Sequence, residues 1–346
     1  MSLPDSDTQN RPFIALAPMA GITDLPMRDL VAEFGADLVV SEMVASGELL
    51  TDRPGTREKA ELGLERTATS VQLAGRDPAV MAEAARQIAG FGARVIDINM
   101  GCPAKKVTGG LSGSALMRDP DLALQLIDAV ANAVDVPVTL KMRLGWDDDN
   151  HNAPDLATRA QSAGVQMVVV HGRTRCQFYK GQADWAAIRR VVEAVSIPVL
   201  ANGDITDLSS ARTALSQSKA AGIMVGRAIQ GQPWMLANLI AQLSGGANDE
   251  LIVLKPDTLK ALVLGHYDAM LGFYGRDLGL RVARKQLGWY MDRAGTPAGL
   301  RGLILRSRDT SEVMAMLQDA FGQFDPAQDA KADPAMDRET AKGLAA

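Results

Sequence analysis

The feature that most constrains the fold of this chain is a series of eight short apolar runs that alternate with amphipathic segments. Runs this short, rich in Val and Ile and nearly unbroken, are typical of parallel strands that are buried on both faces of a sheet. The runs cover residues 13–17, 37–40, 70–73, 95–98, 138–140, 167–170, 199–201 and 223–225. Segments with the periodicity of crossover helices lie between them, at residues 78–91, 121–134, 153–163, 185–195 and 207–215.

Eight strand–helix units within roughly 240 residues predict an α/β fold, the (β/α)8 TIM barrel. Two units share a local pattern, V-D-V-P-V before Lys141 and V-S-I-P-V before Asn202, in which a proline prevents helix continuation and a strand follows. A doubly wound open sheet is the competing architecture. No glycine-rich dinucleotide fingerprint follows the first run, which weakens that alternative.

The domain organisation follows from a change of pattern after Gly245, where the chain becomes purely helical. We predict a barrel domain over residues 11–245 and a smaller C-terminal all-helical domain over residues 246–325, with helical segments near 256–272, 281–294 and 311–321. The remaining ends, residues 1–10 and 326–346, are predicted to be a flexible N-terminus and a flexible tail.

Charge and cysteine usage narrow the class of protein. A formal net charge of −5 excludes a uniformly basic polyanion binder, so nucleic-acid contacts must use local Lys and Arg clusters. Two cysteines are too few for a disulfide framework, and with three histidines they predict no metal site. The start lacks the basic and apolar regions of a signal peptide, and no apolar run is long enough to span a membrane. We therefore expect a cytoplasmic protein.

Polar and small residues follow most of the predicted strands, at the edge of a (β/α)8 barrel that carries the chemistry. Any one of them could be a strand-terminal residue that meets solvent, but a random edge would not collect so many hydrogen-bonding groups. The Gly and Arg of G-R, together with N-G-D, predict a site for a phosphorylated ligand. The residues are Pro18, Met19, Ala20, Gln72, Asn99, Lys141, Arg143, His171, Arg173, Asn202, Gly203, Asp204, Gly226 and Arg227.

Lys141 and Cys102 are the candidates for chemistry. Lys141 ends an apolar strand, where an ammonium could form a structural ion pair, stabilise a reduced flavin, or form the Schiff base of an aldolase. Cys102 is followed by Pro103 and a glycine-rich loop, an arrangement that suits an acid brought to its substrate by loop closure. A free thiol, with a pKa of about 8.5, is mostly protonated at neutral pH and favours proton donation.

Nine motifs spread over the barrel and the helical region resemble those of the tRNA-dihydrouridine synthases, in particular their bacterial B-type branch. The most discriminating contains N-M-G-C-P-A-K-K-V, whereas N-G-D and G-R are shared with other flavin barrels. The motifs are A-P-M-A-G-I-T-D (17–24), V-S-E-M (40–43), D-I-N-M-G-C-P-A-K-K-V (97–107), G-S-A-L (113–116), V-T-L-K-M-R-L-G-W (138–146), V-H-G-R-T-R (170–175), A-N-G-D-I (201–205), G-R-A-I-Q-G-Q-P-W (226–234) and A-R-K-Q-L-G-W-Y (283–290).

The resemblance implies an FMN enzyme that NADPH reduces and that in turn reduces the C5=C6 bond of selected tRNA uridines. A hydride would pass from flavin N5 to C6, and Cys102 would protonate C5 from the other face. The family pattern assigns the isoalloxazine to Pro18, Met19, Ala20, Gln72 and Lys141, and the ribityl phosphate to Asn202, Gly203, Asp204, Gly226 and Arg227. It places Asn99, Arg143, His171 and Arg173 on the uracil side, and His171 also counts among the cofactor contacts.

The uridine must leave its stack, at a cost of a few kcal/mol, so contacts to the RNA beyond the pocket are expected. Arg281, Arg284 and Lys285 are three and four residues apart and share one predicted helix face, although such a trio is also typical of a solvated surface. The partner is expected to be the D-loop region of tRNA, bound by a monomer. The candidate RNA contacts are Lys105, Lys106, Arg173, Arg175, Lys180, Arg281, Arg284, Lys285 and Arg293.

Two functions besides the aldolase remain as alternatives at this point. A flavin barrel of this kind could act on free pyrimidines or dihydroorotate, although a helical domain with basic residues argues for RNA. The chain could also be a non-catalytic tRNA-binding protein on a barrel that has lost its activity, although no essential residue is missing.

Overall fold

The structure, a computed structural model, describes residues 3, 11–63, 69–244, 252 and 254–322. The predicted flexible tail, and the predicted flexible N-terminus apart from Leu3, lie outside the described residues. The chain divides into two compact units, one drawn from residues 1–226 and 239–249 and the other from residues 227–238 and 250–346.

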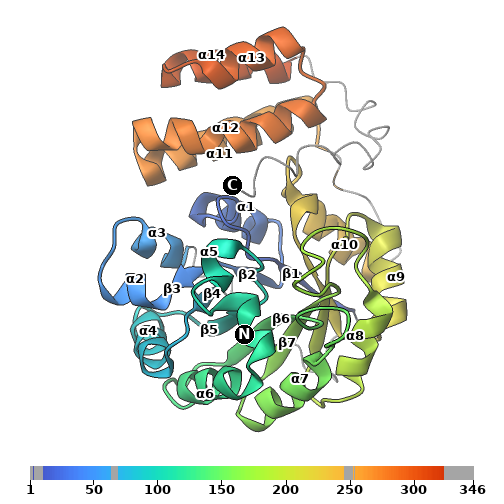
Figure 1. Ribbon diagram of the computed structural model, residues 1–346. Coiled ribbons are helices and arrows are strands. Elements are labelled where there is room, and N and C mark those ends of the chain that lie inside the picture. Colours follow the sequence, from blue (N-terminus) through green and yellow to red (C-terminus); the bar gives the residue numbers. More distant parts are fainter. Residues whose placement is uncertain (1–2, 4–10, 64–68, 245–251, 253, 323–346) are drawn as a thin grey trace. The chain divides into compact units, whose positions relative to one another are not determined.

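Strands of the first unit close into a ring of eight among the described residues (Figure 1). All pairings are parallel, and β1 pairs with both β2 and β9 while β2 also pairs with β4, which closes the ring. The (β/α)8 barrel is therefore confirmed, and the open sheet is wrong. The strands are β1 (Phe13–Leu16), β2 (Leu38–Val40), β4 (Thr69–Ala74), β5 (Val95–Met100), β6 (Val138–Arg143), β7 (Met167–His171), β8 (Val199–Asn202) and β9 (Gly222–Val225), with a short β3 (Val44–Ala45) beside β4.

Helices follow the strands and surround the ring (Figure 1). Five of them begin at an aspartate whose side chain accepts a hydrogen bond from a backbone N–H of the first turn, at Asp24, Asp77, Asp119, Asp184 and Asp207. These caps fix where each strand-to-helix loop ends. The helices are α1 (Leu25–Glu33), α2 (Ser46–Leu50), α3 (Thr56–Ala60), α4 (Pro78–Gly90), α5 (Lys105–Thr108), α6 (Pro120–Ala131), α7 (Ala153–Ser162), α8 (Trp185–Val192) and α9 (Leu208–Ser218), with the 3₁₀ turn η1 (Gly113–Arg118). The 3₁₀ turn η2 (Arg227–Ile229) belongs to the second unit, and α10 (Met235–Leu243) is divided between the two units after Asn238.

Alternation along the strands separates two apolar layers. Outward residues such as Leu140 and Met142 pack with the surrounding helices, whereas inward residues such as Val95 and Val169 fill the barrel. Because successive side chains in a strand point to opposite faces, the residues between the outward ones share the inside of the barrel. This inward face also carries Gln72 of β4, Asp97 and Asn99 of β5, and Thr139 and Lys141 of β6.

The second unit contains α11 (Pro256–Tyr274), α12 (Arg276–Arg293), α13 (Ala298–Arg306) and α14 (Thr310–Gly322). The first two approach closely at Gly279, where a β-carbon would lie 2.7 Å from the carbonyl oxygen of Met270. Gly231 likewise lies against α12, because its β-carbon would be 2.7 Å from the carbonyl oxygen of Trp289. The predicted barrel domain therefore includes a segment, 227–238, that packs with this unit.

The helical prediction agrees with α11, α12 and α14 but gave no helix over α13, whose sequence contains two glycines. None of the described helices combines the length and apolar character needed to cross a membrane.

Candidate active site

Four of the predicted site residues lie on the inward face of the barrel and contact one another in pairs. Asn99 Nδ2 donates a hydrogen bond of 2.7 Å to Gln72 Oε1, and Lys141 Nζ donates one of 3.0 Å to Asn202 Oδ1. All four side chains are buried. They are positioned by regular backbone, because β5 and β6 extend further than the sequence predicted and include Asn99 and Lys141.

Asp97 is a buried residue of this site that the sequence analysis did not single out. Its carboxylate accepts hydrogen bonds of 2.6 Å from Gln72 Nε2 and 2.6 Å from Thr139 Oγ1. Burial raises the pKa of Asp97 to about 6, against the opposing effect of these two hydrogen bonds and of the Lys141 charge. The signal for Asp97 was its spacing, because a residue two positions before Asn99 faces the same side of the strand.

Lys141 keeps its charge in a nearly dry environment. Among the described residues its hydrogen-bond partner is the neutral oxygen of Asn202, whose own Nδ2 donates to the carbonyl of Met224 at 2.8 Å. Burial, with the nearby charge of Arg143, lowers the pKa of Lys141 to about 8. The ammonium is therefore mostly protonated at neutral pH, and an electron-rich group placed beside it would be stabilised.

Cys102 is held from both sides through its backbone. Its N–H donates to Asn99 Oδ1 at 3.0 Å, and its carbonyl accepts from the N–H and hydroxyl of Ser114 at 3.1 and 2.8 Å. Gly113 allows this contact, since it has φ +60° and a β-carbon there would lie 2.9 Å from the Cys102 carbonyl oxygen. The side chain of Cys102 remains partly exposed, and both it and the exposed Cys176 are free thiols.

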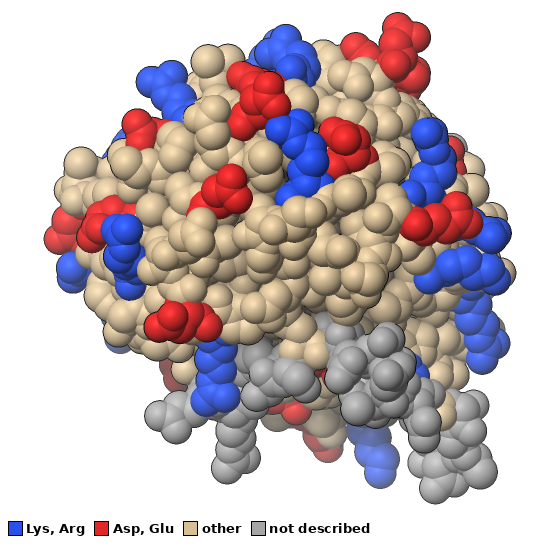
Figure 2. Space-filling model, turned by 90° about the horizontal axis from the view of Figure 1, so that it is seen from below, with Lys and Arg blue, Asp and Glu red and all other residues tan. Residues whose placement is uncertain are grey.

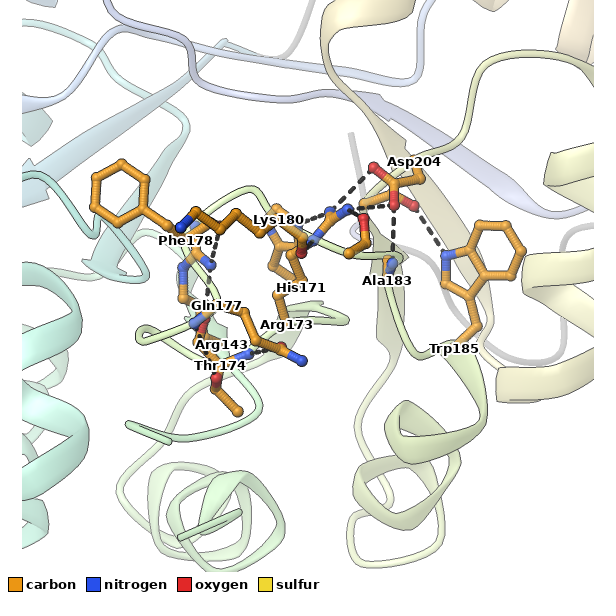
Figure 3. Close-up of polar contacts among 12 residues, drawn as sticks. Arg143, His171, Arg173, Thr174, Gln177, Phe178, Lys180, Ala183, Trp185 and Asp204 are labelled. Atoms are coloured by element: carbon orange, nitrogen blue, oxygen red, sulfur yellow. Dashed lines mark hydrogen bonds and ion pairs between the residues drawn. The ribbon is translucent and has the colours of Figure 1, made fainter. Parts of the chain in front are cut away.

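Arg143 is more deeply buried than its predicted place on the uracil side implies, with 1% of its surface exposed. Its Nε donates to the carbonyl of Gly101 at 2.7 Å, and its Nη1 donates to the carbonyls of Thr174 and Phe178 at 2.9 and 2.8 Å. Burial lowers its pKa to about 10. Arg143 thus connects the segment that carries Cys102 to the loop after β7. Figure 3 shows Arg143 beside Thr174 and Phe178 of that loop.

Arg173 and Asp204 form an ion pair across the loops after β7 and β8 (Figure 3), with Nη–Oδ distances of 3.0 and 2.5 Å. Arg173 is 2% exposed and also donates to the carbonyls of Lys180 and Gly181. The sequence analysis assigned these two side chains to different ligands, and the structure shows that they bind each other. The predicted contacts of Arg173 with RNA and of Asp204 with the phosphate stay predictions.

His171 and Gly203 lie in contact beside this pair. The His171 Nε2 is 3.3 Å from Arg173 Nη1, and a β-carbon on Gly203 would be 2.9 Å from His171 Nε2. The carbonyl of Gly203 accepts from Trp185 Nε1 at 2.9 Å, which fixes the loop after β8 (Figure 3). These contacts hold the Asp204 side chain and the Gly203 carbonyl of the N-G-D segment in place.

The end of β1 adjoins the end of β9 on the same edge of the barrel. A β-carbon on Gly226 would lie 3.6 Å from Met19 Sδ and 3.8 Å from Ala17 Cβ, so the end of β9 is close to the segment that continues to Pro18, Met19 and Ala20. The loop after β1 is held by the buried Glu42, which accepts a 2.5 Å hydrogen bond from the N–H of Gly21. Glu42 lies in the V-S-E-M motif but received no role from the sequence. Arg227 is exposed at the start of η2 in the second unit.

The predicted RNA contacts differ in accessibility. Lys105, Lys106, Lys180 and Arg281 are exposed, whereas Arg175, Arg284, Lys285 and Arg293 are partly buried. Arg284 Nη2 donates to the carbonyl of Ser307 at 3.2 Å. The Cζ atom of Arg175 lies 4.7 Å from the centroid of the Trp146 ring. The face drawn in Figure 2 shows Lys and Arg interspersed with Asp and Glu, so basic character there is local at most.

Comparison with known proteins is consistent with this geometry. The sequence profile of the family described as dihydrouridine synthase (Dus) matches residues 15–324. The chain is 60% identical over 317 residues to a probable tRNA-dihydrouridine synthase of Rhodobacter capsulatus, covering 91% of this chain and 97% of that protein. It is 44% identical over 313 residues to the tRNA-dihydrouridine synthase B of Xanthomonas campestris, covering 90% and 93%. The chain belongs to the dihydrouridine synthase family.

Proposed function

We propose that this protein is a tRNA-dihydrouridine synthase, an oxidoreductase that reduces the C5=C6 bond of uridine in tRNA. The observation that carries the proposal is that a partly exposed thiol, Cys102, follows β5 beside the strand that carries a buried cation, Lys141, in a chain of this family, and that the two groups interact electrostatically. The names of the relatives, which state tRNA-dihydrouridine synthase, support the substrate.

FMN, kept reduced by NADPH, is the proposed cofactor, and when bound it supplies the hydride for C6 of the uracil. The residues at the site fit such a group. The Lys141 ammonium is buried with a neutral oxygen as its hydrogen-bond partner, so an electron-rich ring edge would complete its environment. Pro18, Met19, Ala20 and Gln72 would hold the ring, and the backbone of Asn202 and Gly203, with Gly226 and Arg227, would hold the phosphate.

Cys102 is the proposed proton donor to C5. Asn99 and Ser114 fix the backbone on either side of it, so the thiol is presented from a defined position. Donation leaves a thiolate that solvent reprotonates, which is possible because the side chain is partly exposed. His171 would face the uracil from the end of β7, while Arg143 acts by holding the Cys102 segment. We extend the proposal to a monomeric, cytoplasmic enzyme that acts in the D-loop region.

The experiment that tests this function uses purified protein, FMN, NADPH and a tRNA transcript, with dihydrouridine measured by mass spectrometry of nucleosides. We expect dihydrouridine in the transcript and no consumption of free uracil or dihydroorotate. Turnover of the free pyrimidines with none of the tRNA would contradict the proposal and favour the small-molecule reductase. Bound flavin without any turnover would favour a non-catalytic tRNA-binding protein.

A further inference from the structure

Asp97 has no role in the function proposed above, yet it lies at the centre of the polar groups inside the barrel. It is 1% exposed, and its two carboxylate oxygens each accept one hydrogen bond, from Thr139 Oγ1 and from Gln72 Nε2. No arginine is paired with it among the described residues. Burying a carboxylate whose hydrogen-bond partners are neutral costs desolvation free energy. Packing alone therefore does not explain an aspartate at this position.

The chemistry of a carboxylate gives this network a direction. An ionised carboxylate can only accept hydrogen bonds, so the Gln72 amide must turn its NH2 group towards Asp97 and its oxygen away. That oxygen faces Asn99, which must in turn direct its own NH2 group towards Gln72, at 2.7 Å. Asn99 Oδ1 is then left to accept from the backbone N–H groups of Gly101 and Cys102, at 3.2 and 3.0 Å.

The reverse arrangement is excluded as long as Asp97 is charged. Turning the Gln72 amide over would place its oxygen against a carboxylate oxygen at the 2.6 Å contact. It would also force Asn99 to direct its NH2 group towards two backbone N–H groups. The orientation of two amides, and with them the hydrogen bond to the Cys102 backbone, therefore depends on one acceptor-only group two residues earlier in β5 than Asn99.

We propose that Asp97 is a positioning residue that orients the Gln72 and Asn99 amides and thereby holds the backbone of Cys102. The inference rests on the proposed function, in which Gln72 meets the cofactor and Cys102 donates a proton. Asp97 touches neither reacting group itself. Its effect reaches Cys102 through two side-chain amides.

Three variants separate this role from packing. Thr139→Val removes one donor but keeps the carboxylate, so the direction of the network is unchanged. In Asp97→Asn, the new amide can direct its NH2 group to the Thr139 hydroxyl and keep the direction, or to Gln72 and reverse it. In the double variant, Asp97→Asn with Thr139→Val, the hydroxyl acceptor is gone, and the NH2 group finds an acceptor only when it turns towards Gln72. The preference for the original direction is therefore weakest in this variant.

The first measurement does not depend on catalysis. The chain has two cysteines, so protein labelled with ¹⁵N-cysteine gives one amide resonance from Cys102 and one from Cys176. We expect the Cys102 amide resonance to move upfield in the double variant as its hydrogen bond is lost. It should move part of the way in Asp97→Asn and stay in place in Thr139→Val. Cys176, exposed and outside the network, is the internal control.

The second measurement is turnover of tRNA. We expect kcat to fall about tenfold in the double variant, about threefold in Asp97→Asn and less than twofold in Thr139→Val, with KM for tRNA unchanged. A Cys102 resonance that is the same in the double variant and in Thr139→Val would overturn the inference. If the double variant does not fold, an unmoved resonance in Asp97→Asn would overturn it. The resonances report on Asp97 even if the wild type forms no dihydrouridine, an outcome that would contradict the proposed function alone.

Discussion

Asp97 in the barrel unit and His266 in the helical unit are both buried titratable groups whose pKa is strongly displaced, but their surroundings differ. In the barrel, burial raises the pKa of Asp97 to about 6, and its oxygens begin a network that ends at Cys102. In the helical unit, burial lowers the pKa of His266 to about 4, and its Nδ1 meets Tyr290 Oη at 2.9 Å. His266 Nε2 is buried without a partner among the described residues.

The two groups differ in what they contact. Asp97 bonds Gln72, Gln72 accepts from Asn99, and Asn99 accepts from the backbone N–H of Cys102. His266 packs edge-on against one ring, with 5.9 Å between ring centroids, and behaves as a neutral part of the core. Two ion pairs also differ, in burial, since Arg173–Asp204 in the barrel is largely buried and Arg301–Asp292 in the helical unit is exposed. The barrel also carries exposed pairs such as Arg86–Glu83, so burial and not the unit distinguishes the two.

The largest effect on stability is expected from the ion pairs. Asp204→Asn leaves the buried Arg173 without its counter-charge and should lower the free energy of unfolding by about 3 kcal/mol. Asp292→Asn, in the exposed pair of the helical unit, should change it by less than about 1 kcal/mol. Denaturant titrations of the two variants measure both values. Equal losses of unfolding free energy in the two variants would contradict the distinction between the buried and the exposed ion pair.

The pH dependence of Asp97 is expected to differ in sign from that of His266. With a folded pKa of about 6 against an ordinary 3.8, Asp97 binds its proton more tightly in the folded state. Its stabilising contribution is complete below pH 3.8 and is lost as the pH rises through 6. In the wild type, Asp97 should therefore lower the unfolding free energy by up to about 3 kcal/mol between pH 4 and 6. In Asp97→Asn this contribution should be absent. Urea unfolding at several pH values measures this difference, and parallel profiles would contradict it.

His266 should act in the opposite direction over nearly the same range. Its folded pKa of about 4 against 6.5 means that the unfolded chain binds more protons between these values. The stability it contributes is present above pH 6.5 and is lost as the pH falls through 4. His266→Gln should therefore lose less stability than the wild type on acidification from pH 7 to 4. A wild-type profile that is retained in this variant would show that His266 is not the titrating group.

A smaller effect is expected from the basic residues of the helical unit. Arg284→Ala combined with Lys285→Ala should weaken tRNA binding about tenfold, with flavin content unchanged. The slope of log Kd against log salt concentration should decrease by about two, because two phosphate contacts are lost. Because Arg284 also bonds the carbonyl of Ser307, Arg281→Ala with Lys285→Ala is the cleaner pair. Arg212→Ala, an exposed cation on α9, is the control. Equal loss of tRNA affinity and of flavin would contradict separate roles for the two units.

Much of the fold was predictable because parallel strands and capped helices are local patterns. Each run of Val and Ile marked a strand, and the periodicity of the segments at 78–91 and 121–134 marked the helices α4 and α6. Lys141 and Cys102 could be chosen because a lysine in an apolar strand and a cysteine before a glycine-rich loop are unusual in a sequence. The closed ring was predictable because the sequence contains eight predicted strands, the number that a (β/α)8 barrel requires.

The rest depends on tertiary contacts that no local pattern contains. The Arg173–Asp204 pair joins residues 31 positions apart, so sequence alone gave each partner a ligand instead of the other. Asp97 was passed over because it stands inside a run that reads as buried strand. The position of residues 227–238 depends on the contact of Gly231 with α12, which only the folded chain reveals.

The most direct test of the whole account compares dihydrouridine formation by Cys102→Ala and Cys176→Ala, using purified protein that retains its flavin. With a tRNA transcript and NADPH, we expect the rate of dihydrouridine formation to fall by at least about a hundredfold in Cys102→Ala and to equal the wild-type rate in Cys176→Ala. Dihydrouridine formed at the wild-type rate by Cys102→Ala would contradict the assignment of the proton donor and of the active edge of the barrel.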